Sequence, residues 1–150
     1  MTDRPGPGQE AGTGQLTSID VERCWQLLAG AGVGRLAVCL DGDAPIVVPV
    51  NYRVEDRTIL FRTGPGTKLD LLHDRPVSFQ VDSIDPAHRS GWSVLVRGVA
   101  SIDDARTEAD EAPVPWAGAE RRTMVRIWPA SVTGREVVAG DHDFDPRGYL

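Results

Sequence analysis

The sequence predicts a mainly β protein, a small closed antiparallel β-barrel with short helices. Two observations support this: about six short segments have the composition of strands, and close turns separate several of them, which favours successive hairpins. Closing the barrel removes the exposed edges of such a sheet. With 150 residues, 41% of them hydrophobic, the chain suits one domain with a real core.

Composition divides the chain into a domain and two tails. Residues 1–15 are rich in Gly, Pro, Gln and Thr without a hydrophobic period, so we expect a disordered tail there. Residues 16–138 form the expected domain, and 139–150 a polar C-terminal tail. The net charge of -6 argues against a nucleic acid or an anionic membrane as partner, because both need a cationic face. A small molecule is the expected partner.

The remaining composition predicts a cytoplasmic protein without a metal site. No apolar run approaches the roughly 20 residues that span a bilayer, and the N-terminus lacks the apolar core of a signal peptide. Cys24 and Cys39 stand outside any metal-binding spacing, so both are expected to be buried reduced thiols. The run 141–143, Asp-His-Asp, lies in a tail with no packing to hold metal ligands rigidly.

The first expected element is a helix that begins near Leu16. Thr17 has the chemistry of an N-cap, Asp20 follows three residues later, and Leu16 is placed to pack against Val21. One apolar face follows from the helical spacing of Val21, Cys24, Trp25 and Leu28. The glycines between 30 and 34 end this helix.

Strand patterns dominate the rest of the domain. The expected strands are 35–40, 46–54, 58–62, 77–81 and 92–102, with a last strand or strands at 125–128 and 131–138. The expected connections are turns at 41–43 and 55–57, a short helix at 67–73, a polar loop at 82–91, an acidic helix or loop at 103–111, a Pro-rich link at 113–116 and a basic helix near 119–124. Pro49 lies inside a strand and lacks a ladder N–H, so it indicates an edge or a bulge.

The segment from Phe61 to Leu69 predicts an anion site. It runs from a strand through a glycine-proline turn into the short helix, and it brings Lys68 and the hydroxyl of Thr67 to the helix start. Unpaired backbone N–H groups, the positive end of the helix dipole and an ammonium suit a phosphate. The alternative for Lys68 is a solvated surface side chain.

Several motifs, in this order, resemble a known family. They are Cys24-Trp25, Val33–Ala37, Val47–Asn51, Ile59–Thr63 with Gly66–Lys68, Val77–Asp82, Gly91–Gly98 and Arg126–Arg135. Together they resemble the pyridoxamine 5'-phosphate oxidase-like family, in its short actinobacterial branch, over roughly residues 16–138. The resemblance implies a split β-barrel of antiparallel Greek-key type, a homodimer, and FMN bound at the dimer interface.

The resemblance also implies which residues hold the cofactor. For the phosphate these are Arg62, Thr67 and Lys68; for the ring Pro49, Val50 and Asn51, with Phe61 and Thr63 on the neighbouring strand; and, from the second subunit, Trp92 and Ser93. Each has a plainer alternative. Arg62 suits an exposed strand end, Asn51 a turn or bulge, and Trp92 the core. Arg97 is expected to pair with a carboxylate, within the barrel or across a subunit contact.

The expected function is that of an FMN-dependent oxidoreductase acting on a small molecule stacked on the ring. The resemblance leaves two alternatives, an F420-dependent reductase and a non-catalytic flavin- or haem-binding module. Oxidation of pyridoxamine phosphate itself is not expected, because the C-terminal region lacks the family enzyme's substrate-phosphate pattern of arginine, leucine and histidine. His73, His88 and His142 are scattered and accompany no nucleophile, so hydrolytic catalysis has little support.

Overall fold

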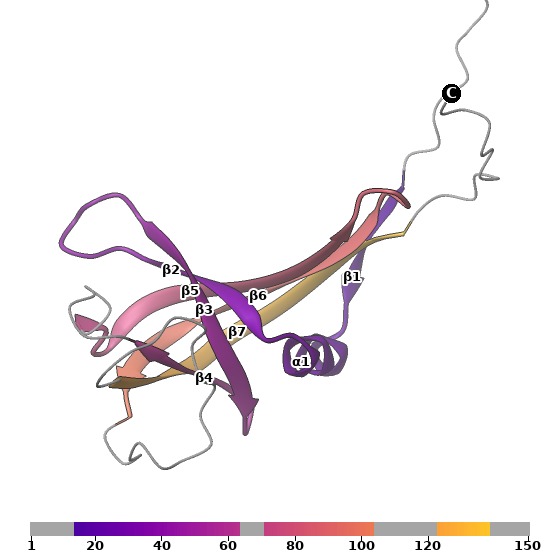
Figure 1. Cartoon of the computed structure of the whole chain (residues 1–150). Coiled ribbons are helices and arrows are strands. Elements are labelled where there is room, and N and C mark those ends of the chain that lie inside the picture. Colours follow the sequence, from indigo (N-terminus) through magenta and orange to yellow (C-terminus); the bar gives the residue numbers. More distant parts are fainter. Residues whose placement is uncertain (1–13, 64–70, 104–122, 139–150) are drawn as a thin grey trace, which may run out of the picture.

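The computed structural model describes residues 14–63, 71–103 and 123–138. The elements there are β1 (Gln15–Ile19), α1 (Val21–Gly30), β2 (Val33–Val38), β3 (Ile46–Glu55), β4 (Thr58–Thr63), β5 (Arg75–Asp85), β6 (Ser90–Ile102) and β7 (Thr123–Val138). Strands β2 to β7 close an antiparallel barrel in the order β7-β4-β3-β2-β5-β6, because β6 pairs back to β7 (Figure 1). The predicted mainly β barrel is confirmed.

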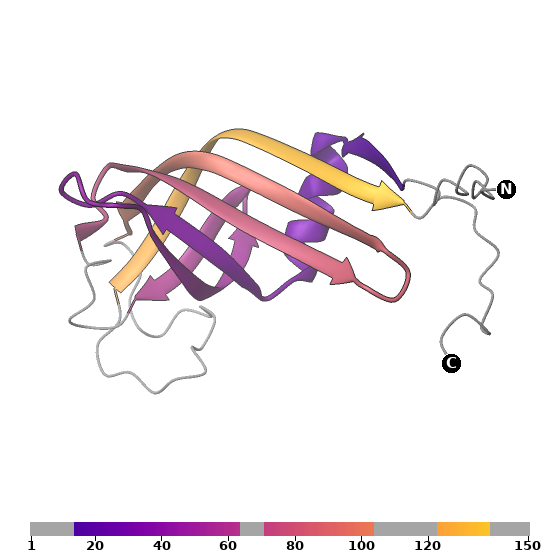
Figure 2. The ribbon, with the colours of Figure 1, turned by 90° about the horizontal axis from the view of Figure 1, so that it is seen from above.

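The connections follow a Greek-key path. Hairpins join β2 to β3 and β3 to β4, and β5 then returns to lie beside β2. The predicted turns are present: Gly42 has φ 77°, and Asp56 and Arg57 have φ 47° and 56°, as a two-residue hairpin requires. α1 lies across one end of the barrel, against β3, β6 and β7 (Figure 2). In the described residues, no helix has the length and apolarity needed to cross a membrane.

Alternate residues of the strands fill the barrel interior. The most completely buried side chains include Leu36, Ile59, Phe61, Phe79, Val94 and Ile127. The rings of Tyr52 and Phe79 meet edge to face, with centroids 4.8 Å apart. Gly34 lies against the Phe79 ring so closely that a Cβ there would overlap it. The core therefore depends on one glycine for its central aromatic contact.

The start of α1 differs from the sequence prediction. Residues 15–19 form β1, which pairs with residues 134–138 of β7, so Thr17 lies in a strand and is not the N-cap. Asp20 is the N-cap, and its carboxylate accepts the N–H of Arg23 at 2.9 Å. Leu16 and Val21 are both exposed, so the predicted staple is wrong. The pairing of β1 with β7 joins residues far apart in the chain, so no local sequence pattern could predict it.

The buried face of α1 is confirmed for three of its four predicted residues: Cys24, Trp25 and Leu28 are buried. The Cys24 thiol lies 3.8 Å from the Ile19 carbonyl oxygen, and burial raises its pKa. Cys39, in contrast, is exposed, so the prediction of two buried thiols holds only for Cys24. The alternation of β2 continues beyond its last residue, Val38: Val38 and Leu40 are buried, and Cys39 between them faces outward.

Several strand and loop boundaries of the structure also differ from those predicted from the sequence. The last strand is one continuous β7, and its Pro129 lies at a bulge opposite Gly98. The polar loop shortens to residues 86–89, because β5 and β6 pair as far as Asp85 and Ser90. Thr123 and Met124 belong to β7, which contradicts the end of the predicted basic helix, and residues 71–73 are not α-helical. Residues 1–13, 64–70, 104–122 and 139–150 lie outside the described residues, and Gln15, the last residue of the expected N-terminal tail, begins β1.

A hydrogen bond from Tyr52 of β3 connects the barrel to α1, and replacement of Tyr52 by phenylalanine tests its contribution to stability. Its hydroxyl donates to the Leu28 carbonyl oxygen at 2.5 Å, which satisfies an acceptor in the last turn of the helix. Tyr52→Phe is expected to lower the free energy of unfolding by about 1 to 2 kcal/mol near neutral pH, measured by urea denaturation. Loss of less than about 0.3 kcal/mol would show that the hydrogen bond contributes nothing net.

The same residue predicts a pH dependence. Burial raises the pKa of Tyr52 above the ordinary tyrosine value. Its contribution to stability is therefore full below about pH 10, where the unfolded-state phenol is also protonated. It is lost as the pH rises further, because only the unfolded state then releases the proton. The wild type should lose stability above that pH more steeply than Tyr52→Phe.

Candidate functional site

The strand β3 is paired on one side only along part of its length. Residues 46–51 pair with β2, whereas β4 pairs only with residues 52–55. We call the unpaired side of residues 46–51 the open edge, since no described strand covers it. Pro49 lies in the middle of this edge, opposite Arg35 of β2. The prediction that Pro49 marks an edge is confirmed.

The backbone groups at the open edge follow from the register. The Tyr52 N–H donates to the Gly32 carbonyl oxygen at 3.2 Å, so these residues form a hydrogen-bonded pair. Such pairs alternate along an antiparallel ladder. Val47 and Pro49 therefore stand in non-hydrogen-bonded pairs with β2, and their backbone groups turn to the open edge. The edge presents carbonyl oxygens and an N–H in a fixed row, and the missing N–H of Pro49 breaks no ladder bond.

The strand β4 leaves β3 where the open edge ends. Tyr52 pairs with Phe61, but Arg62 and Thr63 continue beside β7 only, opposite Met124 and Thr123. The two strands therefore separate at Asn51 and Arg62. The six predicted site residues of these two strands, Pro49, Val50, Asn51, Phe61, Arg62 and Thr63, thus stand on either side of this point of separation, where only Tyr52 and Phe61 still pair.

These six residues differ in what they can offer a ligand. The Phe61 side chain is fully buried in the core and Thr63 is buried, so side-chain contact by Phe61 is not possible without repacking. Val50 also packs against the core. Arg62 is half-buried at the strand end. Pro49 and Asn51 lie on the outer side of β3, whose alternate residues Val48 and Val50 face the core.

The remaining predicted residues do not join this site in one chain. Thr63 pairs with Thr123 and Ser93 with Arg135, and these β7 residues are 12 positions apart (135 minus 123). At about 3.3 Å per residue this is roughly 40 Å along the strand (Figure 1). Trp92 packs partly against the core, as its plainer alternative expects. Thr67 and Lys68 lie outside the described residues.

The sequence analysis did not predict a charged cluster around Arg126. The Arg126 guanidinium donates to Asp103 at 3.0 and 3.1 Å and to the Thr58 hydroxyl at 2.7 Å, and its Nη2 lies 3.5 Å from Glu55. It also lies 5.6 Å from the centre of the Trp128 ring. These contacts tie the β3–β4 hairpin to β6 and β7. The partners are too far apart in sequence for any local pattern to reveal them.

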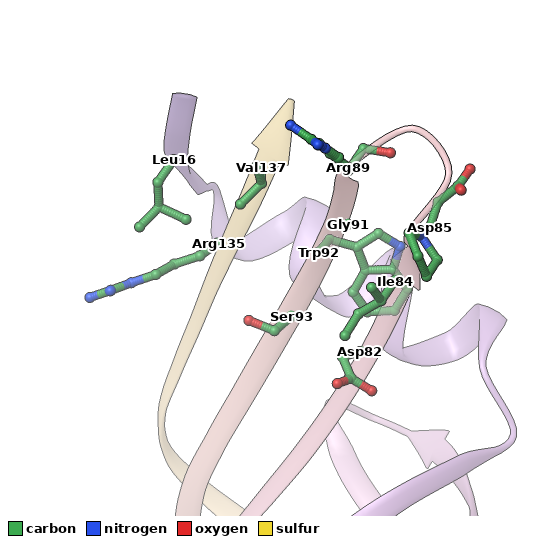
Figure 3. Close-up of a pocket in the computed structure, with 12 residues that line it drawn as sticks. Leu16, Asp82, Ile84, Asp85, Arg89, Gly91, Trp92, Ser93, Arg135 and Val137 are labelled. Atoms are coloured by element: carbon green, nitrogen blue, oxygen red, sulfur yellow. The ribbon is translucent and has the colours of Figure 1, made fainter. Parts of the chain in front are cut away.

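A groove of about 560 Å³ lies at the β5–β6 hairpin, and Trp92 and Ser93 are among its lining residues (Figure 3). Its other walls come from β1 and β7, through Leu16, Arg135 and Val137. Sequence reasoning placed Trp92 and Ser93 correctly at a strand start but missed the β1 and β7 walls, because these need the long-range pairing. Arg97 lies outside the groove and pairs with no carboxylate of the described residues.

Comparison with known proteins decides the family. A family model described as pyridoxamine 5'-phosphate oxidase matches residues 20–136. The chain belongs to this family. The protein Rv0080 of Mycobacterium tuberculosis is 31% identical to this family member over 134 residues, covering 83% of this chain and 88% of Rv0080.

Solved structures agree with the fold of this pyridoxamine 5'-phosphate oxidase family member. The FAD binding protein from Mycobacterium smegmatis is 35% identical with a TM-score of 0.64, covering 81% of this chain and 98% of that chain. A FAD-binding protein from Mesorhizobium loti is 27% identical with a TM-score of 0.68, covering 83% and 98% respectively. The resemblance to the family and the split-barrel fold are thus both confirmed.

Proposed function

We propose that this pyridoxamine 5'-phosphate oxidase family member is a flavin-dependent oxidoreductase that uses FMN. The observation that carries the proposal is the open edge of β3 next to the strand end at Arg62. Similarity to the two FAD-binding proteins supports a flavin as the ligand. The substrate is a small molecule that reaches the exposed face of the ring.

The donor set at the open edge fits a flavin. The polar rim of the flavin ring carries one donor, the N3–H, between two carbonyl oxygens, and Val47 and Pro49 offer a backbone N–H and carbonyl oxygens in a row that can pair with these groups. Arg62, with Thr67 and Lys68 of the following segment, would hold the phosphate. When bound, the flavin supplies the hydride or electron transfer. The chain binds the cofactor, orients it and keeps water from one face.

The proposal includes a homodimer in the cytoplasm. Thr63 of β4 pairs with the first residue of β7, whereas Ser93 of β6 pairs near the other end of β7. Both therefore contribute to one site only if Ser93 comes from a second copy. Outer-face side chains Val47, Leu95, Val99 and Trp128 are large, apolar and exposed, which favours burial in a subunit contact. Two free thiols, one of them exposed, suit a reducing compartment.

Absorption spectroscopy and an FMN titration test this function. The purified protein is expected to show a flavin spectrum or to bind added FMN with a rise in melting temperature. Lys68→Ala should weaken FMN affinity by about 1 to 3 kcal/mol, through loss of a charge-assisted contact. Arg57→Ala is the control: this cation lies in the β3–β4 turn and pairs with Glu22 of α1. A colourless protein whose melting temperature does not change when FMN is added would refute the proposal.

A non-catalytic binding module remains a second candidate function. Val47, Pro49 and Asn51, the outward residues of the open edge, include no acid, base or nucleophile. Sustained reduction of an acceptor with NAD(P)H or reduced F420 would exclude a pure carrier. The spectrum of the isolated protein would also distinguish FMN from F420 or haem.

A further inference from the structure

The outer face of the sheet at the β5–β6 hairpin carries an apolar row. Ile84 pairs with Gly91, Gly91 with Val137, and Val137 with Leu16, so these four residues stand side by side on four strands. Ile84 is 70% exposed, Leu16 57% and Val137 36%. Ile84, Gly91 and Val137 all line the groove, and Gly91 adds no side chain between the two apolar ones. Adjacent exposed apolar side chains of this kind mark a binding surface.

Charged residues surround the apolar row, and their pairing is unequal. Asp82 accepts a hydrogen bond from Arg35 at 2.9 Å, and Asp85 lies 2.6 Å from His88 Nδ1 and accepts the backbone N–H groups of Ala87 and His88. These contacts lower the pKa of Asp85, chiefly through its hydrogen bonds with His88. Both carboxylates of the groove therefore have partners already.

The two guanidinium groups of the groove, Arg89 and Arg135, are different. Neither makes an ion pair with a carboxylate in the part of the chain that the structure describes. Figure 3 shows the side chain of Arg89 extending from the β5–β6 turn and that of Arg135 from β7, with Leu16 and Val137 drawn between them. In a chain of net charge -6, this groove has two available positive charges beside the apolar row.

We propose that this hairpin groove binds a small, largely apolar organic anion. Its apolar part lies on Ile84, Val137 and Leu16, and its carboxylate, sulfonate or phosphate meets the guanidinium group of Arg135 or of Arg89 beside that row. The volume of about 560 Å³ is of the size that small-molecule sites have. In the proposed dimer, Trp92 and Ser93 bring this groove next to the cofactor, so the bound anion is the substrate. That last identification rests on the proposed function, whereas the binding itself does not.

The binding is tested with two fluorescent probes that share their rings and differ in charge. 8-Anilinonaphthalene-1-sulfonate is anionic, and N-phenyl-1-naphthylamine lacks the sulfonate. Isothermal titration of the full chain, with and without saturating FMN, should show the anionic probe binding more tightly. Arg135→Gln should weaken the anionic probe about fivefold, and the double change with Arg89→Gln about tenfold or more, while the neutral probe changes less than about twofold.

Two further variants complete the experiment. Arg97→Gln removes the same charge from the same sheet outside the groove and should leave both affinities unchanged. Ile84→Asp, at an exposed position, should weaken both probes. Equal affinities for the two probes, or equal effects of Arg97→Gln and Arg135→Gln, would overturn the proposal. Loss of anionic-probe binding when FMN saturates the protein would also overturn it, because the groove would then belong to the cofactor.

Discussion

Gly98→Ala is expected to destabilise the barrel by about 3 kcal/mol or more, enough to prevent folding of a marginally stable domain. Gly98 lies at the bulge where β6 and β7 change register, opposite Pro129. A Cβ there would overlap the Trp128 carbonyl oxygen and lie 2.9 Å from the Pro129 Cα. Both neighbours are backbone atoms of the longest strand, so neither can move aside without breaking ladder bonds.

Chemical denaturation measures this effect, with Gly30→Ala as the matched control. Gly30 ends α1, and a Cβ there has no atom within 4 Å, so alanine should be neutral or slightly stabilising. If Gly98→Ala unfolds at the same denaturant concentration as Gly30→Ala, the close approach of β6 to β7 is wrong. Circular dichroism separates an unfolded variant from a poorly expressed one.

Arg126→Met is expected to lower the free energy of unfolding by about 2 to 4 kcal/mol, the second-largest effect. The Arg126 side chain is only 12% exposed, and its removal leaves Asp103, itself mostly buried, without its cation, whereas Glu55 keeps its ion pair with Arg53 at 2.8 Å. The Thr58 hydroxyl also loses its donor. Methionine keeps much of the apolar volume, so the loss reports chiefly the uncompensated carboxylate of Asp103.

Arg35→Met is the control for this variant. Arg35 forms an ion pair with Asp82 at 2.9 Å, but its side chain is 54% exposed, and exposed pairs contribute about 0 to 1 kcal/mol. The two substitutions remove the same charge and differ in burial. Equal denaturation midpoints for the two variants would contradict the role of the Arg126 cluster. A double change with Asp103→Asn should recover part of the loss, since it removes one buried charge.

The sequence predicted much of the fold because its evidence is local. Strand alternation, the turns at 41–43 and 55–57 and the buried side of α1 each involve residues close together in the chain. The edge at Pro49 was also predictable, since a missing N–H is a property of the residue itself. Order and spacing of the motifs then identified the family, which the match over residues 20–136 confirmed.

Errors arose where a distant strand decided the local structure. Residues 15–19 look like a helix start, yet they pair with β7 more than a hundred residues later, and this moves the N-cap from Thr17 to Asp20. In the same way, pairing with β6 joins two short strand patterns into the 16-residue β7. Cys39 follows an apolar strand, but the alternation of β2 in the closed barrel turns it outward.

For the site, the sequence by itself determined the chemistry: a proline that suits an edge, a lysine a few residues after β4, and a family whose members share these motifs. The tertiary structure alone decided the geometry, because barrel closure is a set of long-range pairings with no local pattern. It left β3 open beside Pro49, buried the side chain of Phe61, and separated Ser93 from Thr63 along β7. It also assembled the Arg126 cluster and the hairpin groove, whose residues come from strands far apart in the chain.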